Sequence, residues 1–315
     1  MKISVVEPLG ISDEQLRGLI GDAVGDFDVE LVTYPDRKED EASLIERSKD
    51  ADIVVVSNIK YPAAVMQECP NLKYICVAFT GYDHVDMAYC REHGITVSNC
   101  AGYSTVAVAD LTFGLLLAVY RNIVACDKAV RCGGTKAGLV GPELEGKTFG
   151  IVGAGAIGSR VARIANAFGC KVLAYSRTKK DLPDVTFVDT IEELMSACDV
   201  ISLHVPQTPE TTGLINAERI ALMKPTAVLI NCARGPVVDS AALADALNEG
   251  RIAGAGIDVF ETEPPIATDH PLLSAKNVVA TPHVAFASNE AMYKRAVIVA
   301  DNVAAYLAGA PINLV

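Results

Sequence analysis

The sequence predicts an α/β protein built from two doubly wound parallel sheets. Short, continuously apolar segments recur along the 315 residues and alternate with helical stretches, which is typical of parallel strands buried on both faces. The segments of the first half correspond in order to those of the second half. A glycine-rich turn occurs in the second half alone, so we expect two domains with different tasks.

The expected strands define the limits of these domains. In the first half they lie at 2–7, 28–34, 51–57, 72–78 and 95–98, and the corresponding segments of the second half lie at 147–152, 170–175, 198–204 and 226–232. A long helix from Ser104 follows the first half, and a final helix, 288–308, should return to it. We therefore expect a substrate domain of residues 1–99 plus 287–315 and a dinucleotide-binding domain of residues 100–286, with the active site in the cleft between them.

The glycine-rich turn is the most informative motif. An apolar strand ending at Val152 runs into Gly153-Ala154-Gly155-Ala156-Ile157-Gly158 and then a helix. Gly153 suits a tight turn, Gly155 lets the backbone approach a diphosphate, and Gly158 lets the helix pack on the strand. The helix N-terminus favours an anion. We therefore expect a dinucleotide to bind at Gly153, Gly155, Ala156, Ile157 and Gly158.

The end of the next strand suggests which dinucleotide binds. A carboxylate there would hold the ribose 2′-hydroxyl of NAD. This chain instead has Ser176-Arg177-Thr178-Lys179-Lys180. Arginine and lysine suit a 2′-phosphate, and Ser176 and Thr178 can donate hydrogen bonds to it. This segment favours NADP over NAD, although a solvated basic loop has the same composition.

Charge and cysteine content indicate which partners the protein does not bind and in which compartment it lies. A net charge of −12 argues against nucleic acid and anionic membranes as partners. The nine cysteines form no C-x-x-C pair, and the chain begins directly with a strand. We therefore expect a cytoplasmic protein without disulfides and, since no His and carboxylate cluster has ligand spacing, without a metal. The apolar helix 105–119 is too short to span a bilayer and must be covered by other protein.

Three polar residues follow three successive strands of the second half: Arg234, Glu263 and His283. The carboxyl ends of parallel strands share one edge of a sheet, so these side chains can converge near a nicotinamide. Each has a structural alternative when taken singly, as a salt bridge, a surface residue or a satisfied histidine. Their joint placement favours a catalytic set.

The chemistry of the three side chains fits reduction of a 2-oxo acid. Arg234 can bind the substrate carboxylate in a forked manner and polarise the carbonyl. His283 can deliver a proton, because imidazole titrates near neutral pH. A carboxylate such as Glu263 beside it favours the charged imidazolium.

With these motifs the chain resembles the D-isomer-specific 2-hydroxyacid dehydrogenases. The matching segments are 152–158, 203–208, 231–239, 256–264 and 281–285 in the second half and Thr80-Gly81-Tyr82-Asp83-His84-Val85-Asp86 in the first. The resemblance implies that Arg234, Glu263 and His283 are catalytic and that Glu263, rather than Glu261, is the partner of His283. It also implies a twofold homodimer formed through the region of helix 105–119.

The resemblance implies further ligand contacts. For the cofactor they involve Asp258 at the nicotinamide carboxamide, His204, Val205 and Pro206 along the adenosine, and Cys232, Ala233, His283 and Ala285. For the substrate they involve Arg234, backbone groups of the loop Ala78, Phe79, Thr80 and Gly81, and Tyr103. The segment 176–180 resembles the NADPH-using glyoxylate and hydroxypyruvate reductases.

The sequence does not identify the side chain of the substrate. Candidate pocket residues are Asn58, Ile59, Phe79, Tyr82, Tyr103 and Phe286, and the absence of arginine among them disfavours a phosphorylated substrate. We expect His270 to be a surface loop residue. Alternatives are a formate- or phosphite-type dehydrogenase, against which Pro282 argues because formate-oxidising relatives have glutamine there, and a nucleotide-sensing corepressor without turnover.

Overall fold

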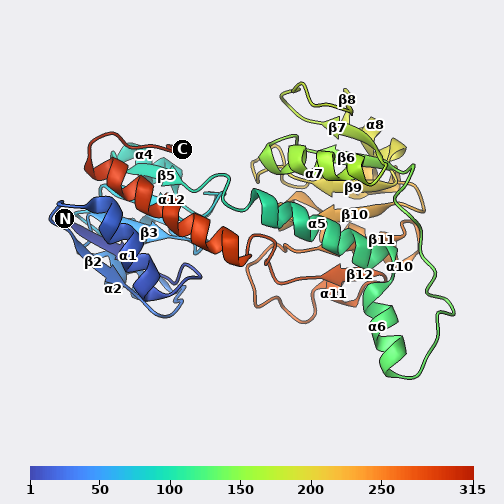
Figure 1. Ribbon diagram of the computed structural model, residues 1–315, viewed down its shortest axis with the longest axis horizontal. Helices are drawn as coiled ribbons and strands as arrows, with labels where there is room; N and C mark the ends of the chain where they lie inside the picture. The colour runs from blue at the N-terminus through green and yellow to red at the C-terminus, as the bar shows by residue number, and fades with distance from the viewer. The chain divides into compact units, whose positions relative to one another are not determined.

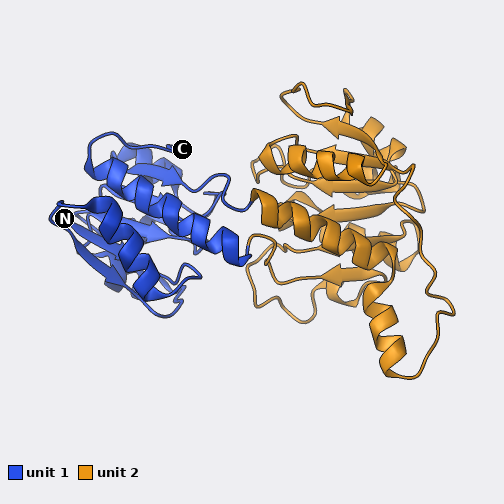
Figure 2. Ribbon diagram, in the orientation of Figure 1, with its two compact units in different colours: residues 1–104, 287–315 blue, residues 105–286 orange.

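The computed structural model describes residues 1–315, and the chain divides into two compact units (Figure 2). Unit 1 contains residues 1–104 and 287–315, and unit 2 contains residues 105–286. Residues 100–104, which the sequence placed in the second domain, thus belong with unit 1. Both units are α/β, with parallel sheets throughout, as the sequence predicts.

Unit 1 has a five-stranded parallel sheet in the order β2-β1-β3-β4-β5. The strands are β1 Lys2–Val5, β2 Glu30–Thr33, β3 Ile53–Val56, β4 Tyr74–Val77 and β5 Thr96–Asn99. The helices are α1 Asp13–Val24, α2 Glu41–Ser48, α3 Ala63–Gln67, α4 Met87–Glu92 and α12 Asn289–Leu307. Every residue of β3 and β4 is buried, which explains their uninterrupted runs of apolar residues.

The final helix, α12, belongs to unit 1. Helix α12 packs against α1 and β4. The ring of Tyr306 stacks on that of Tyr74 with centroids 4.2 Å apart, and Asn302 donates from Nδ2 to the carbonyl oxygen of Asn99 at 3.0 Å. Residues at opposite ends of the sequence therefore share one core.

Unit 2 has a seven-stranded parallel sheet in the order β12-β11-β10-β9-β6-β7-β8. The strands are β6 Thr148–Val152, β7 Lys171–Tyr175, β8 Val185–Phe187, β9 Val200–Leu203, β10 Val228–Asn231, β11 Gly254–Ile257 and β12 Val278–Ala280. The sequence did not predict β8, a three-residue edge strand with no buried residue. Helices α5 Thr105–Tyr120, α6 Ile123–Arg131, α7 Ala156–Ala167, α8 Ile191–Ala197, α9 Ala217–Ala221, α10 Ser240–Asn248 and α11 Pro271–Ser274, with the 3₁₀ turn η1 Gly235–Val237, complete it (Figure 1).

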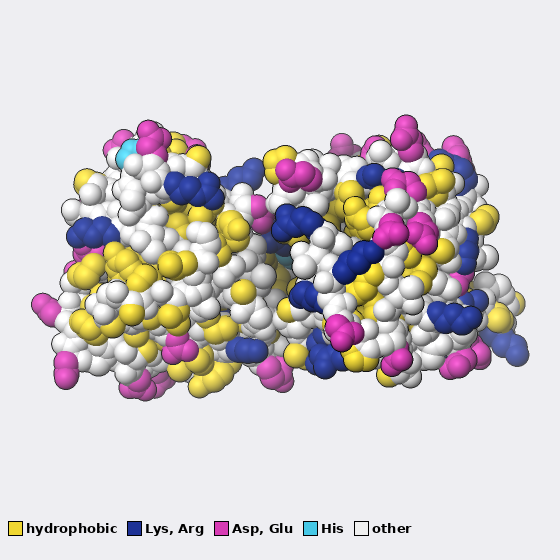
Figure 3. All heavy atoms as spheres, turned by 90° about the horizontal axis from the view of Figure 1, so that it is seen from above, with side chains coloured by type: hydrophobic (Ala, Val, Ile, Leu, Met, Phe, Trp, Pro, Cys, Tyr) yellow, Lys and Arg dark blue, Asp and Glu magenta, His cyan; other side chains and the backbone are white.

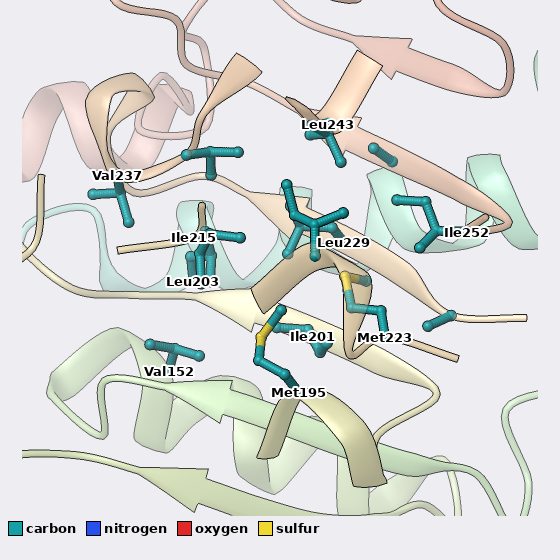
Figure 4. Close-up of a cluster of buried hydrophobic side chains, with 14 of the residues drawn as sticks. Val152, Met195, Ile201, Leu203, Ile215, Met223, Leu229, Val237, Leu243 and Ile252 are labelled. Carbon is teal, nitrogen blue, oxygen red and sulfur yellow. The ribbon is translucent and has the colours of Figure 1, made fainter. Parts of the chain in front are cut away.

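A large apolar cluster fills one side of this sheet (Figure 4). Ile201, Leu203 and Leu229 from β9 and β10 meet Met195 from α8 and Leu243 from α10, and all five are buried. Such a core fixes the strands in register, and with them the loops that leave their carboxyl ends.

The apolar helix 105–119 corresponds to α5, and its own unit covers most of it. It packs against β10, β11, β12 and α7 and buries seven residues, among them Phe113 and Leu116. No single helix is long and apolar enough to cross a membrane; only α5 and α6 taken together meet that test, and they are bent by 58° at the break between them.

Helix α6 follows α5 and, unlike it, is largely exposed. It has no buried residue, and Ile123, Val124 and Val130 are at least half exposed, as is Val140 in the following loop. Helix and loop protrude from the rest of unit 2 (Figure 1).

The charged side chains do not gather by sign. On the face drawn in Figure 3, Lys and Arg lie among Asp and Glu rather than in one continuous basic surface.

Candidate active site

The glycine-rich turn joins β6 to α7 with little room for side chains. Gly153 has φ +98°, and a Cβ there would lie 2.7 Å from the carbonyl oxygen of His204. A Cβ on Gly158 would lie 2.1 Å from the carbonyl oxygen of Gly153. Both positions therefore require glycine.

The N-terminus of α7 fits an anionic group. Gly155 is its N-cap and offers no side-chain hydrogen bond, so the first N–H groups of the helix, at Ala156, Ile157 and Gly158, have no intrahelical acceptor. A Cβ added to Gly155 would meet nothing within 4 Å, so the backbone there is open to a ligand. This cradle fits the diphosphate of a dinucleotide.

The basic segment after β7 lies close to carboxylates from elsewhere in the chain. Ser176 is half-buried, and Arg177 and Thr178 are exposed. Lys179 pairs with Asp189 at 2.6 Å. A hydrogen bond from Thr208, with a smaller contribution from the nearby Arg177 cation, holds the pKa of Glu210 below its usual value.

The strand next to β6 brings a histidine to the glycine turn. His204 follows β9, its N–H donates to Val152 O at 2.8 Å, and Nε2 lies 2.9 Å from Ser202 Oγ. Desolvation lowers the pKa of His204 to about 3, so its ring is neutral at physiological pH. Val205 lies over Gly153, where an added Cβ would come within 2.9 Å of its Cγ1, and Pro206 follows at the surface.

Asn231, the last residue of β10, holds the turn that follows this strand. Asn231 donates from Nδ2 to Arg234 O at 2.9 Å and accepts from Ala233 N at 3.0 Å, so its amide closes the turn around Cys232. The Arg234 side chain leaves this turn half-buried, with Nη1 2.8 Å from Ala233 O.

Gly235 brings this turn against the next one. A Cβ on Gly235 would lie 1.9 Å from the carbonyl carbon and oxygen of Phe260, so only glycine fits. The turn that holds Arg234 thus contacts the start of the loop after β11.

Asp258 is fully buried and holds the segment that follows β12. Its Oδ1 accepts from Thr281 Oγ1 at 2.6 Å and Val284 N at 2.9 Å, and its Oδ2 accepts from Ala285 N at 2.9 Å. Sequence reasoning missed this network and in particular the part played by Thr281.

His283 lies within the segment that Asp258 holds. Its N–H donates to the Asp258 carbonyl oxygen at 2.8 Å, and its φ is +55°, a conformation unusual for a side chain larger than asparagine. Its Nδ1 lies 2.7 Å from Glu263 Oε2 and 2.9 Å from Oε1. The ring is one-tenth exposed and meets the Phe286 ring edge-on at 5.4 Å.

Glu261 has a different partner. Its Oε2 lies 2.8 Å from Nε2 of His270, and the side chain of His270 is only 14 % exposed. The Nδ1 of His270 accepts from Leu272 N at 3.3 Å and so caps α11. His270 lies in the loop before α11, as expected, but its ring is mostly covered: it packs edge-on against Phe260, and its pairing with Glu261 closes the ten-residue loop that contains Glu263.

The three candidate residues thus come from adjacent strands of one sheet. β10, β11 and β12 are neighbours, and Arg234, Glu263 and His283 leave their carboxyl ends. A guanidinium and an imidazole paired with a carboxylate can bind an anion and transfer a proton. No three His, Cys, Asp or Glu side chains come together in an arrangement that could hold a metal ion.

The predicted substrate loop belongs to unit 1. Ala78 and Phe79 are buried, and the Phe79 carbonyl accepts from Cys100 N at 2.9 Å. The Thr80 carbonyl accepts from Asn99 Nδ2 at 2.7 Å, and Gly81 is half-buried. Tyr103 is buried with its ring 6.2 Å from that of Phe79.

Two arginines that the sequence did not associate with the substrate lie beside expected substrate residues, Arg37 at Asn58 and Arg295 at Ala78. Arg37 donates to Asn58 Oδ1 at 2.8 Å and pairs with the buried Glu7. Arg295 donates to the carbonyl oxygen of Ala78 at 3.3 Å. The expected pocket residues are apolar and aromatic in sequence, but cationic side chains stand next to them.

Known proteins resemble this chain over most or all of its length. The glyoxylate reductase of Thermofilum pendens is 45 % identical over 273 residues, which is 84 % of this chain and 80 % of that protein. An acyclic imino acid reductase solved with NADPH and D-Arg has a TM-score of 0.90 at 34 % identity and covers all of both chains. The NADPH-dependent glyoxylate/hydroxypyruvate reductase of Sinorhizobium meliloti, solved with NADP and malonate, has a TM-score of 0.85 at 33 % identity and covers 100 % of this chain and 96 % of that one.

Fold and site together define an oxidoreductase with a Rossmann-type domain for a nicotinamide dinucleotide. Residues 113–285 match the family described as D-isomer specific 2-hydroxyacid dehydrogenase, NAD binding domain. The chain belongs to this family, whose members interconvert 2-hydroxy acids and 2-oxo acids, and it acts on the CH–OH group of its donor.

Proposed function

We propose that the chain reduces glyoxylate, hydroxypyruvate or a small apolar 2-oxo acid to the D-2-hydroxy acid and prefers NADPH to NADH. The observation that carries this proposal is the contact between His283 Nδ1 and Glu263 Oε2 at 2.7 Å, on the sheet edge that also presents Arg234. The names of the relatives support the substrates.

The roles of the three side chains follow from their contacts. Glu263 accepts a hydrogen bond from Nδ1–H of His283 and so orients the ring, and Nε2 carries the proton that goes to the substrate carbonyl oxygen. Arg234 binds the substrate carboxylate through its planar fork. A nicotinamide bound by unit 2 would supply a hydride for the carbonyl carbon, and with the proton from His283 the carbonyl would become an alcohol. In the reverse direction His283 accepts the proton.

The cradle of unit 2 places the dinucleotide. Gly153, Gly155 and the first N–H groups of α7, at Ala156, Ile157 and Gly158, hold the diphosphate. His204, Val205 and Pro206 line the adenosine. Further contacts come from Cys232, Ala233, Asp258, His283 and Ala285.

The segment after β7 sets the preference for NADP. Ser176, Arg177 and Thr178 bind the 2′-phosphate, and no carboxylate follows β7 directly to repel it. Arg177 and Thr178 are exposed and therefore available to a ligand.

Unit 1 contributes a substrate-binding loop. Backbone N–H groups of the Ala78–Gly81 loop hold the carboxylate, and Tyr103 lies near the substrate. The exposed apolar side chains of α6 support a homodimer formed through this helix rather than through the largely buried α5. The free cysteines suit the reducing cytoplasm.

A second candidate reaction is reduction of an imine of the same acids. The likeness to the imino acid reductase, with a TM-score of 0.90 over both whole chains, favours its inclusion. Protonation by His283 and carboxylate binding by Arg234 serve either reaction.

The test is consumption of NADPH or NADH by the full-length chain with glyoxylate, hydroxypyruvate and pyruvate, each with and without ammonium. Turnover without ammonium, abolished in His283→Ala, is the expected result. Turnover that requires ammonium would identify an imine reductase. Tight nucleotide binding without turnover would identify a nucleotide sensor and contradict the proposal.

A further inference from the structure

Arg295 is a buried cation at the edge of the unit 1 sheet where ligands of such sheets bind. It lies on α12 and is 3 % exposed. It donates to Leu9 O at 2.7 Å, Ser57 Oγ at 2.9 Å and Ala78 O at 3.3 Å. These acceptors follow β1, β3 and β4, so one side chain joins the carboxyl ends of three neighbouring strands.

The position next to the substrate loop gives this arginine a consequence for binding. Ala78 begins the loop, and its own N–H donates to Val56 O at 2.7 Å. The Ser57 hydroxyl lies between the guanidinium and the loop, 3.4 Å from Ala78 O. The orientation of the Ala78 peptide, and of the N–H groups that follow it, therefore depends on Arg295.

The charge also acts on its surroundings. The Arg295 guanidinium lies 5.7 Å from the centre of the Tyr103 ring. Burial raises the pKa of the Tyr103 hydroxyl, and the Arg295 cation is the largest opposing influence. Because a chain of net charge −12 repels an anionic substrate at long range, a fixed positive charge beneath the binding loop matters.

We propose that Arg295 is a positioning residue for the substrate carboxylate: from α12 it holds the Ala78–Gly81 loop with its N–H groups presented to the carboxylate and supplies positive charge beneath them. This rests on the proposed function. A purely structural role makes a different prediction, because loss of Arg295 would then lower the stability without changing KM or carboxylate binding.

The chain offers a matched control. Arg47 is a second mostly buried arginine of unit 1, at 9 % side-chain exposure, and it also binds main-chain oxygens, those of Val6 at 2.7 Å and Asp36 at 2.8 Å. It stacks on Tyr34, 4.4 Å from the ring centre, and has no contact with the Ala78–Gly81 loop. Its loss should affect folding stability alone.

The experiment compares Arg295→Met, Arg295→Lys and Arg47→Met with the wild type. Steady-state reduction of glyoxylate by NADPH gives KM and kcat, and calorimetric titration of the NADPH-bound protein with malonate measures carboxylate binding without turnover. We expect Arg295→Met to raise KM and the malonate Kd together by roughly 10-fold or more, with kcat within about threefold. Arg295→Lys should restore part of the loss, and Arg47→Met should lower Tm with KM within about twofold of the wild type.

The other outcomes are equally decisive. A KM and a malonate Kd within about twofold of the wild type in Arg295→Met would overturn the proposal. If that variant does not fold, Ser57→Ala replaces it: we expect a KM raised about threefold, and an unchanged KM would overturn the proposal. If the wild type turns over no 2-oxo acid, the proposed function fails, and the malonate titration alone decides the role of Arg295; absence of malonate binding to the wild type counts against it.

Discussion

Replacement of Asp258 by asparagine should loosen the segment that contains His283. The amide can keep its oxygen toward Thr281 and Val284, but its NH₂ group then faces the N–H of Ala285, and that hydrogen bond is lost. Hydrogen bonds to a charged group contribute about 1.5–3 kcal/mol and neutral ones about 0.5–1.5 kcal/mol. The two bonds that survive thus lose about 1 kcal/mol each, and the third loses about 1.5–3 kcal/mol.

Removal of a buried charge offsets part of this sum, which leaves a net cost of about 2–3 kcal/mol. Hydrogen exchange measured by mass spectrometry on a peptide spanning 281–286 reports directly how much less free energy is needed to open this segment. The amides of Val284 and Ala285 should exchange roughly 30- to 150-fold faster than in the wild type. Asp239→Asn is the control, because Asp239 caps α10 and asparagine caps equally well. Exchange within threefold of the wild type in Asp258→Asn would refute the reasoning.

Three further predictions follow from other contacts. His283→Ala should lower kcat by roughly 100- to 10,000-fold while NADPH, followed by its fluorescence, still binds; near-normal turnover would exclude His283 as the proton donor. Ser176→Asp combined with Arg177→Gln should lower the ratio of kcat/KM for NADPH over NADH by roughly 10-fold or more, and a wild type that prefers NADH would defeat the phosphate assignment. Burial alone would raise the pKa of Asp199, but hydrogen bonds from the Thr148 N–H and from Lys224 lower it below the ordinary 3.8. The folded state thus binds this proton more weakly than the unfolded state, so the stability that Asp199 contributes is present above about pH 4 and is lost as the pH falls through the lower folded value. In urea titrations Asp199→Asn should be less stable than the wild type by about 1–2 kcal/mol at pH 7, with the gap narrowing as the pH falls below 3.8; a gap that does not narrow over that range would contradict the linkage.

The sheets could be predicted from sequence because their strands are buried on both faces. The strands β3, β4 and β9 are each four buried apolar or small residues, and β10 has three buried apolar residues before Asn231; such runs are recognisable without periodicity. The edge strand β8 has no such run, and its pairing with β7 depends on a neighbour that the local sequence does not specify.

The site was predictable where one residue type at one strand end decides the geometry. His283 satisfies this condition, whereas Glu263 was chosen over Glu261 through the family resemblance; the two side chains lie in contact. The pairing of Glu261 with His270 was not predictable, because it closes a loop whose path the local sequence leaves open. Arg295 could not be associated with Ala78 either, since 217 residues separate them and only the return of α12 brings them together.

The discontinuity of unit 1 has a consequence for synthesis on the ribosome. Residues 105–286 form a complete sheet and core of their own, so unit 2 can fold as soon as it emerges. At that moment β4 still lacks α12, and Tyr74, Cys76 and the backbone of Asn99 await contacts that Asn302 and Tyr306 provide. The domain translated first is thus the last to complete its fold. Until the last thirty or so residues are synthesised, its incomplete sheet exposes apolar surface that could associate with other nascent chains.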